Sequence, residues 1–290
     1  MRMFLLRHVL GLVGVVLGAA LLLSMLLDLI PNAPAAADMP GWLRFLALMA
    51  GLVTGDFGIS ASQNAPVGTL IAERLAVTLP LALLSLIIAK AVGFGLGLLA
   101  ARSAVADRAL GGLARLFALQ PPFWLGMLLV LGLALTLKLL PAGGFVPWSS
   151  PVAALTSLLL PALALGLPHA GETGLGVRRD FERGLDATAI LAQRAAGRTA
   201  KGARWTLGLG AAIRALPRRL GRQVISILAG AALVENVFYL PGLGRQILGA
   251  VAQHDLVLLR GSLFVLIVIG AVAMVLASLG RLLDDRRVAE

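Results

Sequence analysis

Apolar residues are gathered into long runs along the chain, separated by shorter polar stretches. Each run approaches or exceeds the roughly 20 residues that a helix needs to cross a bilayer. Helices are expected because an open strand would leave backbone groups unpaired in lipid. The pattern predicts an all-α integral membrane protein, one domain over 1–290, with six transmembrane helices at about 9–30, 76–100, 116–137, 153–176, 223–240 and 257–280.

The first run resembles a secretory signal, because two arginines precede it and Ala35-Ala36-Ala37 follows it. A signal-peptide core has about 7–15 apolar residues. The run from Val9 to Ile30 is longer than that and long enough to span a bilayer. We therefore expect a retained first span, with cleavage after the alanines as the alternative.

Charge sets the expected orientation. The net charge is +11, although only 13% of the residues are charged. The stretch 178–222 holds eleven basic and three acidic residues, whereas 31–75 and 241–256 are poor in lysine and arginine. Basic loops stay in the cytoplasm, so both termini and 178–222 are predicted to be cytoplasmic. Nucleic acid is not an expected partner, because the basic stretch contains no recognition pattern and, in its second half, a single aromatic residue, Trp205.

One segment of the outer loop 31–75 has apolar residues at helical spacing, from Trp42 to Val53. Such a helix either lies on the outer membrane interface with Trp42 at the headgroups or packs against the protein itself.

Catalytic patterns are missing from the sequence. It has no G-x-x-x-x-G-K-[ST] phosphate loop, no cysteine and no H-E-x-x-H, and its three histidines fall in separate regions. We expect no enzymatic activity, no metal site and no cofactor on this chain.

Three ionisable residues lie within predicted spans: Lys90, His169 and Glu172. A lysine at the centre of a span costs roughly 2.5–3.5 kcal/mol on insertion scales. The three residues either line a polar pathway, or serve structure, with Lys90 reaching toward the inner interface or pairing with Glu172.

The most specific motif follows the fifth span, and it resembles the E-x-V-F-x-x-P-G-L-G signature of oligopeptide/dipeptide-type ABC permeases. Pro241 cannot continue a helix, and Gly242 and Gly244 permit a tight turn, so a short helix from about Arg245 to His254 should return along the outer face. Glu235 either lines the pathway or braces this turn. The matching residues are Val234-Glu235-Asn236-Val237-Phe238-Tyr239-Leu240-Pro241-Gly242-Leu243-Gly244.

A second stretch is similar to the family's G-D-x-G-x-S … P-V … I-x-x-R-L pattern. The likeness extends over nearly the whole chain, with a core at 74–280. It is carried by Gly55-Asp56-Phe57-Gly58-Ile59-Ser60, by Pro66-Val67 and by Ile71-Ala72-Glu73-Arg74-Leu75.

This resemblance implies a type I importer fold in a bacterial inner membrane, with the chain forming half of the translocation pathway. The partners implied are a second homologous permease, a periplasmic solute-binding protein and two ATP-binding cassette subunits, which bind the ATP and Mg²⁺. The substrates implied are di- or oligopeptides, a nickel chelate or another small solute. An ATPase-independent channel or a structural membrane protein is the alternative.

The resemblance also implies a coupling helix in the cytoplasmic loop 178–222. The family pattern D-Y-x-x-x-A-R-A-K-G falls on Thr188–Gly197, where this sequence keeps Arg194, Ala195 and Gly197. A helix from Asp186 to Ala196 is expected, because Asp186 can cap its start and Gly197 can reverse the chain after it. The ATPase contact implied comprises Asp186, Arg194, Ala195, Gly197 and Arg198.

Overall fold

A computed structural model describes residues 2–26, 40–118 and 120–289. Within these ranges the regular structure is helical, apart from one isolated bridge between Ile59 and Pro66. The elements are α1 Arg2–Leu26, α2 Gly41–Thr54, α3 Val67–Arg102, α4 Ala104–Ala118, α5 Pro122–Leu129, the π-helix η3 Val130–Thr136, α6 Pro151–Arg183, α7 Ala187–Ala195, α8 Ala200–Ala215, the 3-10 helix η4 Leu216–Arg219, α9 Leu220–Val237, α10 Leu243–Ala252 and α11 Leu256–Ala289.

Four of the described helices are long and apolar enough to cross a membrane: α3, α6, α9 and the Leu256–Ser278 part of α11. A fifth span is obtained if the bent pair Ala104–Phe117 and Pro122–Thr136 is counted as one. A shorter apolar helix covers Leu10–Leu23, and residues 27–30 of the predicted first span lie outside the described residues. The protein is thus an all-helical membrane protein.

The third predicted span, 116–137, is wrong as a single helix. The chain breaks before Pro121 and Pro122, and the helices on either side meet at 105°. A residue before proline is pushed out of the helical region, so consecutive prolines end α4 and begin α5. The preceding stretch 102–115, expected to be a loop, instead forms most of α4, whose Leu110 and Ala114 are buried.

The spans α3 and α6 are longer than predicted, at 36 and 33 residues, and they form the centre of the bundle. They run parallel and approach closely at glycines. A Cβ atom on Gly93 would lie 2.5 Å from the carbonyl oxygen of Ala170, and one on Gly97 would lie 2.7 Å from that of Gly174. Small residues let helix backbones touch in this way in membranes.

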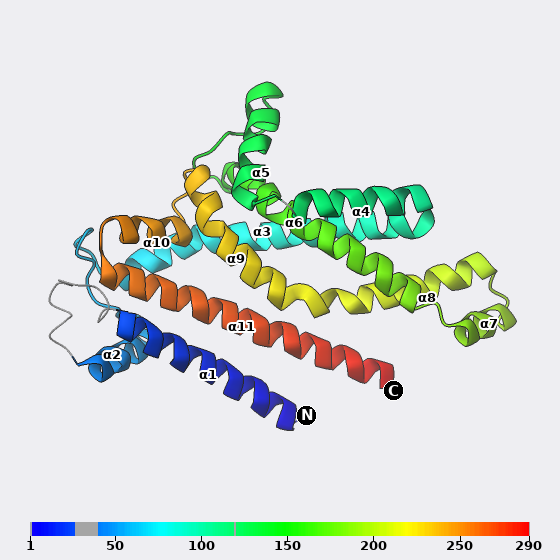
Figure 1. Cartoon of the computed structure of the whole chain (residues 1–290), viewed down its shortest axis with the longest axis horizontal. Helices are drawn as coiled ribbons and strands as arrows, with labels where there is room; N and C mark the ends of the chain where they lie inside the picture. Colours follow the sequence, from blue (N-terminus) through cyan, green and yellow to red (C-terminus); the bar gives the residue numbers. More distant parts are fainter. Residues whose placement is uncertain (1, 27–39, 119, 290) are drawn as a thin grey trace.

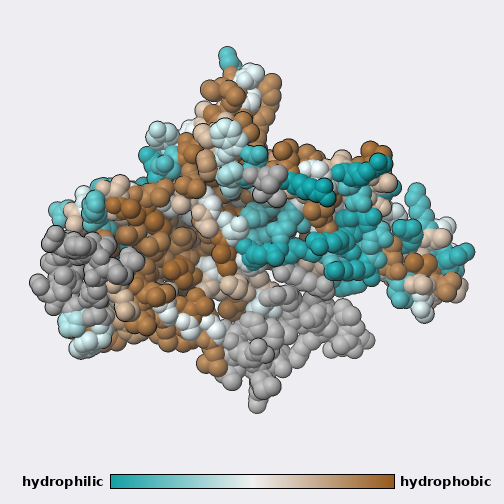
Figure 2. Space-filling model, in the orientation of Figure 1, coloured by the Kyte–Doolittle hydropathy of each residue, from teal (hydrophilic) through white to brown (hydrophobic). Residues whose placement is uncertain are grey.

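Figure 1 shows the long helices extended between two ends of the molecule. One end carries α2, α10 and the start of α11, and the other carries α7 and the outer turns of α8. On the face in Figure 2, apolar residues dominate between the first end and the middle, and hydrophilic residues gather from the middle toward the second end. We call these the α10 end and the α7 end.

Of the two placements of α2 that the sequence left open, the structure shows packing against the protein. Phe45 and Met49 pack against the apolar core at the α10 end, beside Phe57 and Phe264. Trp42 on the same helix is 64% exposed. Helix α2 therefore packs on the protein through Phe45 and Met49, while Trp42 in its first turn stays exposed.

Candidate functional site

The motif after α9 forms a closed turn around the carboxylate of Glu235, which is fully buried. Its Oε1 accepts a hydrogen bond from Thr78 Oγ1 at 2.6 Å, and its Oε2 accepts one from the Arg245 backbone N–H at 3.0 Å. Thr78 Oγ1 in turn accepts from the Leu243 backbone N–H at 2.8 Å. Glu235 therefore accepts a hydrogen bond from one backbone N–H at the start of α10 directly and satisfies a second through Thr78. The helix dipole also favours a negative charge at this helix start.

The end of α9 has the hydrogen bonds of a Schellman motif. Leu240 N–H donates to the Glu235 carbonyl at 2.8 Å, and Tyr239 N–H donates to the Asn236 carbonyl at 3.3 Å. The left-handed residue is Tyr239, at φ 55°. Its ring lies against the Arg245 guanidinium, 5.0 Å from the ring centre.

Gly242 and Gly244 serve close approach rather than backbone freedom, because neither has a positive φ. A Cβ on Gly242 would lie 2.2 Å from the carboxyl carbon of Glu235, and one on Gly244 would lie 2.4 Å from the Cα of Ala232. The tight turn expected of these glycines is instead made at Tyr239. Helix α10 then begins at Leu243, slightly before the predicted Arg245.

Phe238 anchors the turn in the core and is fully buried. A Cβ on Gly126 of α5 would lie 2.8 Å from its ring, so that glycine makes room for the side chain. The Gly144 N–H donates to the Phe238 carbonyl at 2.8 Å. Pro241, the remaining residue of the motif, is partly buried just before α10.

The second motif, 55–60, folds into a loop attached to the turn before α11. Gly55 and Gly58 adopt φ +75° and +92°, which explains the glycines in this pattern. Buried Ser60 donates through Oγ to Asp255 Oδ2 at 2.6 Å, and Ser62 donates to the same oxygen through Oγ at 2.7 Å and through its N–H at 2.9 Å. Sequence reasoning did not select Asp255, although the serine of the motif was a signal for a buried acceptor.

Burial of Asp255 by itself favours the neutral acid, but its hydrogen bonds from Ser60, Leu258 and Ser62 outweigh burial and lower the pKa of the carboxyl. A lowered pKa stabilises the fold above the unfolded-state pKa, about 3.9. That contribution is lost as the pH falls through the folded-state pKa. The contribution of Asp255 to holding the 55–60 loop against the start of α11 should therefore be complete from neutral pH down to about pH 5.

Asp255→Asn should destabilise the purified protein at pH 7 by about 1–3 kcal/mol, because an amide cannot replace a carboxylate that accepts several hydrogen bonds. The measurement is thermal or denaturant unfolding in detergent at pH 7 and at pH 3. The difference between variant and wild type should shrink at pH 3. An equal difference at both pH values would contradict the role of the charge.

At the α7 end, the short helix α7 has the expected cap at each terminus. Asp186 Oδ1 accepts from the Ala189 N–H at 2.8 Å. Arg194 and Ala195 form its last turn, and Gly197 follows at φ +84°, with the Arg198 N–H donating to the Gln193 carbonyl at 3.1 Å. No residue of α7 is buried, so the described part of the chain provides little to hold this helix.

An ion pair joins the last turns of α6 to η4, the two elements between which α7 and α8 lie. Asp180, with 5% of its side chain exposed, lies 3.0 Å from Arg219 in η4 and 3.6 Å from Arg183. The Arg219 guanidinium lies over Gly176, where a Cβ would be 2.4 Å from its Cζ. This part-buried pair ties η4 to α6. In the sequence, Asp180 stood out only as one of the three acidic residues of 178–222. Arg198 donates to Thr206 Oγ1 at 2.8 Å.

The three ionisable span residues lie within α3 and α6, and their partners are in η4 and the first turn of α9. Lys90 Nζ donates to the Leu216 carbonyl at 3.3 Å. Glu172 pairs with Arg222 and lies 3.7 Å from His169 Nδ1. Glu172 therefore pairs across to α9 rather than with Lys90, and the lysine reaches toward η4.

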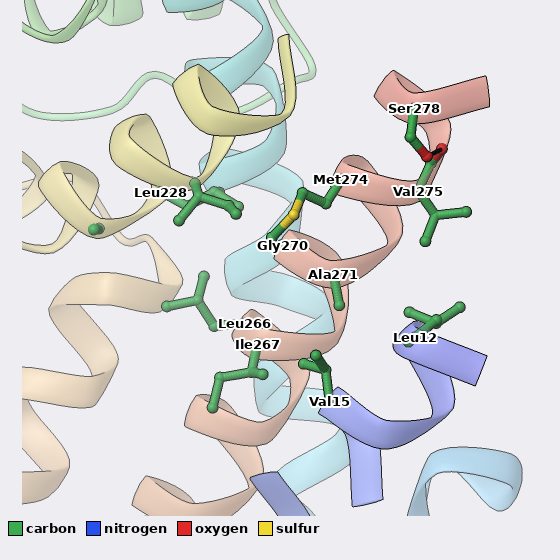
Figure 3. Close-up of a pocket in the computed structure, with 13 residues that line it drawn as sticks. Leu12, Val15, Leu228, Leu266, Ile267, Gly270, Ala271, Met274, Val275 and Ser278 are labelled. Atoms are coloured by element: carbon green, nitrogen blue, oxygen red, sulfur yellow. Dashed lines mark hydrogen bonds between the residues drawn. The ribbon is translucent and has the colours of Figure 1, made fainter. Parts of the chain in front are cut away.

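An apolar cavity of about 480 Å³ lies among α1, α9 and α11. Figure 3 shows Leu12 and Val15 of α1 facing Ile267 and Ala271 of α11. Among the described residues, carbon-rich side chains line it with Ser278 as the one polar side chain, and none of these lining residues is charged. Among the described residues, no group of three or more His, Cys, Asp or Glu side chains is placed to hold a metal.

Residues 93–290 match the family described as the inner-membrane component of binding-protein-dependent transport systems. The chain belongs to this family: it is a multi-pass inner-membrane permease subunit of a transporter, not an enzyme. It is 30% identical to a putative peptide transport system permease protein of Brucella suis, over 92% of each chain. It is also 30% identical to the dipeptide transport system permease protein of Escherichia coli, over 79% of this chain and 75% of that protein. A dipeptide transport system permease protein of Lactococcus lactis is 28% identical over 87% of this chain.

Proposed function

We propose that this permease forms half of the translocation pathway of an ATP-driven importer of di- or oligopeptides. The observation that carries the substrate class is the similarity to peptide and dipeptide permeases over most of the chain. The chain has no phosphate-loop motif, so ATP must be hydrolysed by partner subunits. A second permease, two ATPase subunits and a periplasmic binding protein complete the proposed complex.

We further propose six spans with both termini in the cytoplasm, the first being α1 and the third the bent pair of α4 and α5. In Figure 1 the first turn of α1 and the last turn of α11 both point away from the α10 end, which supports an even number of crossings. The basic stretch 178–222 lies at the same end. Positive residues concentrate on the cytoplasmic side, so the α10 end is assigned to the periplasm.

Cysteines introduced at Ala61 and Ala200 should label oppositely with a membrane-impermeant thiol reagent applied to intact cells. Both alanines are exposed, one at each end of the bundle, and the chain has no other cysteine. Position 61 should be labelled from outside, and position 200 only after permeabilisation. External labelling at position 200 would reverse the assigned orientation.

In this arrangement α7 is the element that contacts the ATPase, through Asp186, Arg194, Ala195, Gly197 and Arg198. Its exposed surface and rigid caps support that role. Glu235 with the Pro241–Gly244 turn braces the periplasmic face. Lys90, His169 and Glu172 brace the cytoplasmic ends of the spans, since their contacts reach η4 and α9.

Affinity purification of the tagged chain from its native membrane should recover a second, non-identical permease and the ATPase subunits. Uptake of labelled dipeptide into proteoliposomes should require all of these and ATP. Identification of the ligand on the co-encoded binding protein then tests the substrate class. Solute flux through the chain alone, without ATPase, would instead establish the channel alternative.

A further inference from the structure

The α7 end contains a second cavity, of about 770 Å³, between the spans and the loop 178–222. It lies where the last turn of α3 meets α6 and the first turns of α8. Its cations are Arg102, Lys201 and Arg204, and Phe181 and Trp205 supply aromatic walls. Those two rings stack edge to face with centres 5.0 Å apart.

The three cations of this cavity are poorly neutralised within the described part of the chain. Arg102 lies over the Trp205 ring at 4.7 Å, an interaction that holds the guanidinium in place and leaves its charge. Arg204 comes no closer than 3.9 Å to Glu182, whose Oε1 is already held at 2.9 Å by Arg178. Lys201 has no acidic partner among the described residues. The cavity is therefore a preformed, positively charged socket.

The socket lies at the end of the membrane-spanning helix α3. Arg102 is the last residue of this helix, and Leu99 one turn earlier is 51% exposed. The second span predicted from the sequence ends at residue 100, so Arg102 is expected in the headgroup layer next to the hydrocarbon core. Tryptophan is also enriched at this level. Helix α7 projects farther from the spans than this point (Figure 1).

We propose that this cavity binds the phosphate of an anionic phospholipid of the cytoplasmic leaflet. The phosphate accepts hydrogen bonds from Arg102, Lys201 and Arg204 and joins the end of α3 to the start of α8. Basic pockets between transmembrane helices on the cytoplasmic side recognise lipid headgroups in this way. The proposal needs only the assigned orientation, and it holds whatever solute the transporter carries.

The test is equilibrium titration of the detergent-purified full chain with short-chain phosphatidylglycerol, with phosphatidylcholine of the same chain length, and with inorganic phosphate. The wild-type chain should prefer phosphatidylglycerol to phosphatidylcholine. Lys201→Gln with Arg204→Gln should weaken phosphatidylglycerol binding by about tenfold or more. Arg204→Lys, which keeps the charge, should retain most of it.

The matched control is Arg108→Gln with Arg214→Gln, which removes the same charge from two exposed positions outside the socket. The control should bind within about twofold of wild type, because only nearby charges act strongly. An equal loss in the control would show general surface attraction and overturn the proposal. Inorganic phosphate binding as tightly as the lipid would overturn the lipid assignment in favour of a free-phosphate site. Loss of lipid binding once the ATPase is attached would assign the socket to an acidic group of that subunit.

Discussion

Gly197→Val should lower substrate-stimulated ATP hydrolysis and transport together, by roughly 5–30-fold. Gly197 adopts φ +84°, and a residue with a side chain pays about 1–2 kcal/mol in this region, more if it is β-branched. Each 1.4 kcal/mol is a tenfold change in an equilibrium. Only a small fraction of the variant molecules would therefore keep the chain reversal that follows α7. A Cβ at this position meets nothing within 4 Å. The expected effect of the substitution is therefore backbone strain and not a steric clash.

The neighbouring residue supplies a matched control. Ala196→Val adds the same kind of side chain at an exposed position with φ −80°, and should keep nearly full coupling. Gly197→Asn should also be tolerated, since asparagine enters the left-handed region most readily after glycine. ATPase co-purification, stimulated hydrolysis and uptake are measured on each purified complex. Wild-type values for Gly197→Val would remove α7 as the coupling element.

Gly242→Ala should destabilise the protein by about 1–3 kcal/mol, the usual cost of overpacking a filled site. The new Cβ would fall 2.2 Å from the carboxyl carbon of Glu235. That carboxylate holds Thr78 and the first turn of α10, so it cannot move without losing hydrogen bonds. We expect weaker docking of the binding protein as well, because this turn lies on the face assigned to the periplasm.

Gly249→Ala in the same helix is the control. Its Cβ would lie 3.7 Å from the nearest side-chain atom, an ordinary contact, and alanine is favoured over glycine in a helix by up to about 1 kcal/mol. Denaturant unfolding in detergent should rank the variants Gly249→Ala, wild type, Gly242→Ala. In a Glu235→Ala background the cost of Gly242→Ala should fall, since the two changes share one contact. Simple additivity would contradict the close packing.

Sequence periodicity and charge were enough to establish a helical membrane protein, because apolar runs of span length have no other stable arrangement in lipid. The local signals around α7 were equally readable. Asp186 and Gly197 act on their own neighbouring backbone, so a helix cap and a left-handed residue can be inferred without the rest of the fold. The motif at 234–244 was sufficient to indicate the family.

Contacts between distant segments were decided only by the tertiary structure. The sequence could not show that Glu235 meets Thr78, that Asp180 meets Arg219 or that Asp255 meets Ser60, because these pairs are separated by 157, 39 and 195 positions. The same reason explains the glycines of the Pro241–Gly244 turn: they are required by the atoms that approach them, not by their own φ. The break at Pro121 and Pro122 was visible in the sequence, yet the 105° bend depends on where α4 and α5 pack. Helices and their caps follow from residues close together in the sequence. The partners of the buried charged residues, and the positions that must be glycine, follow from the packing of distant segments.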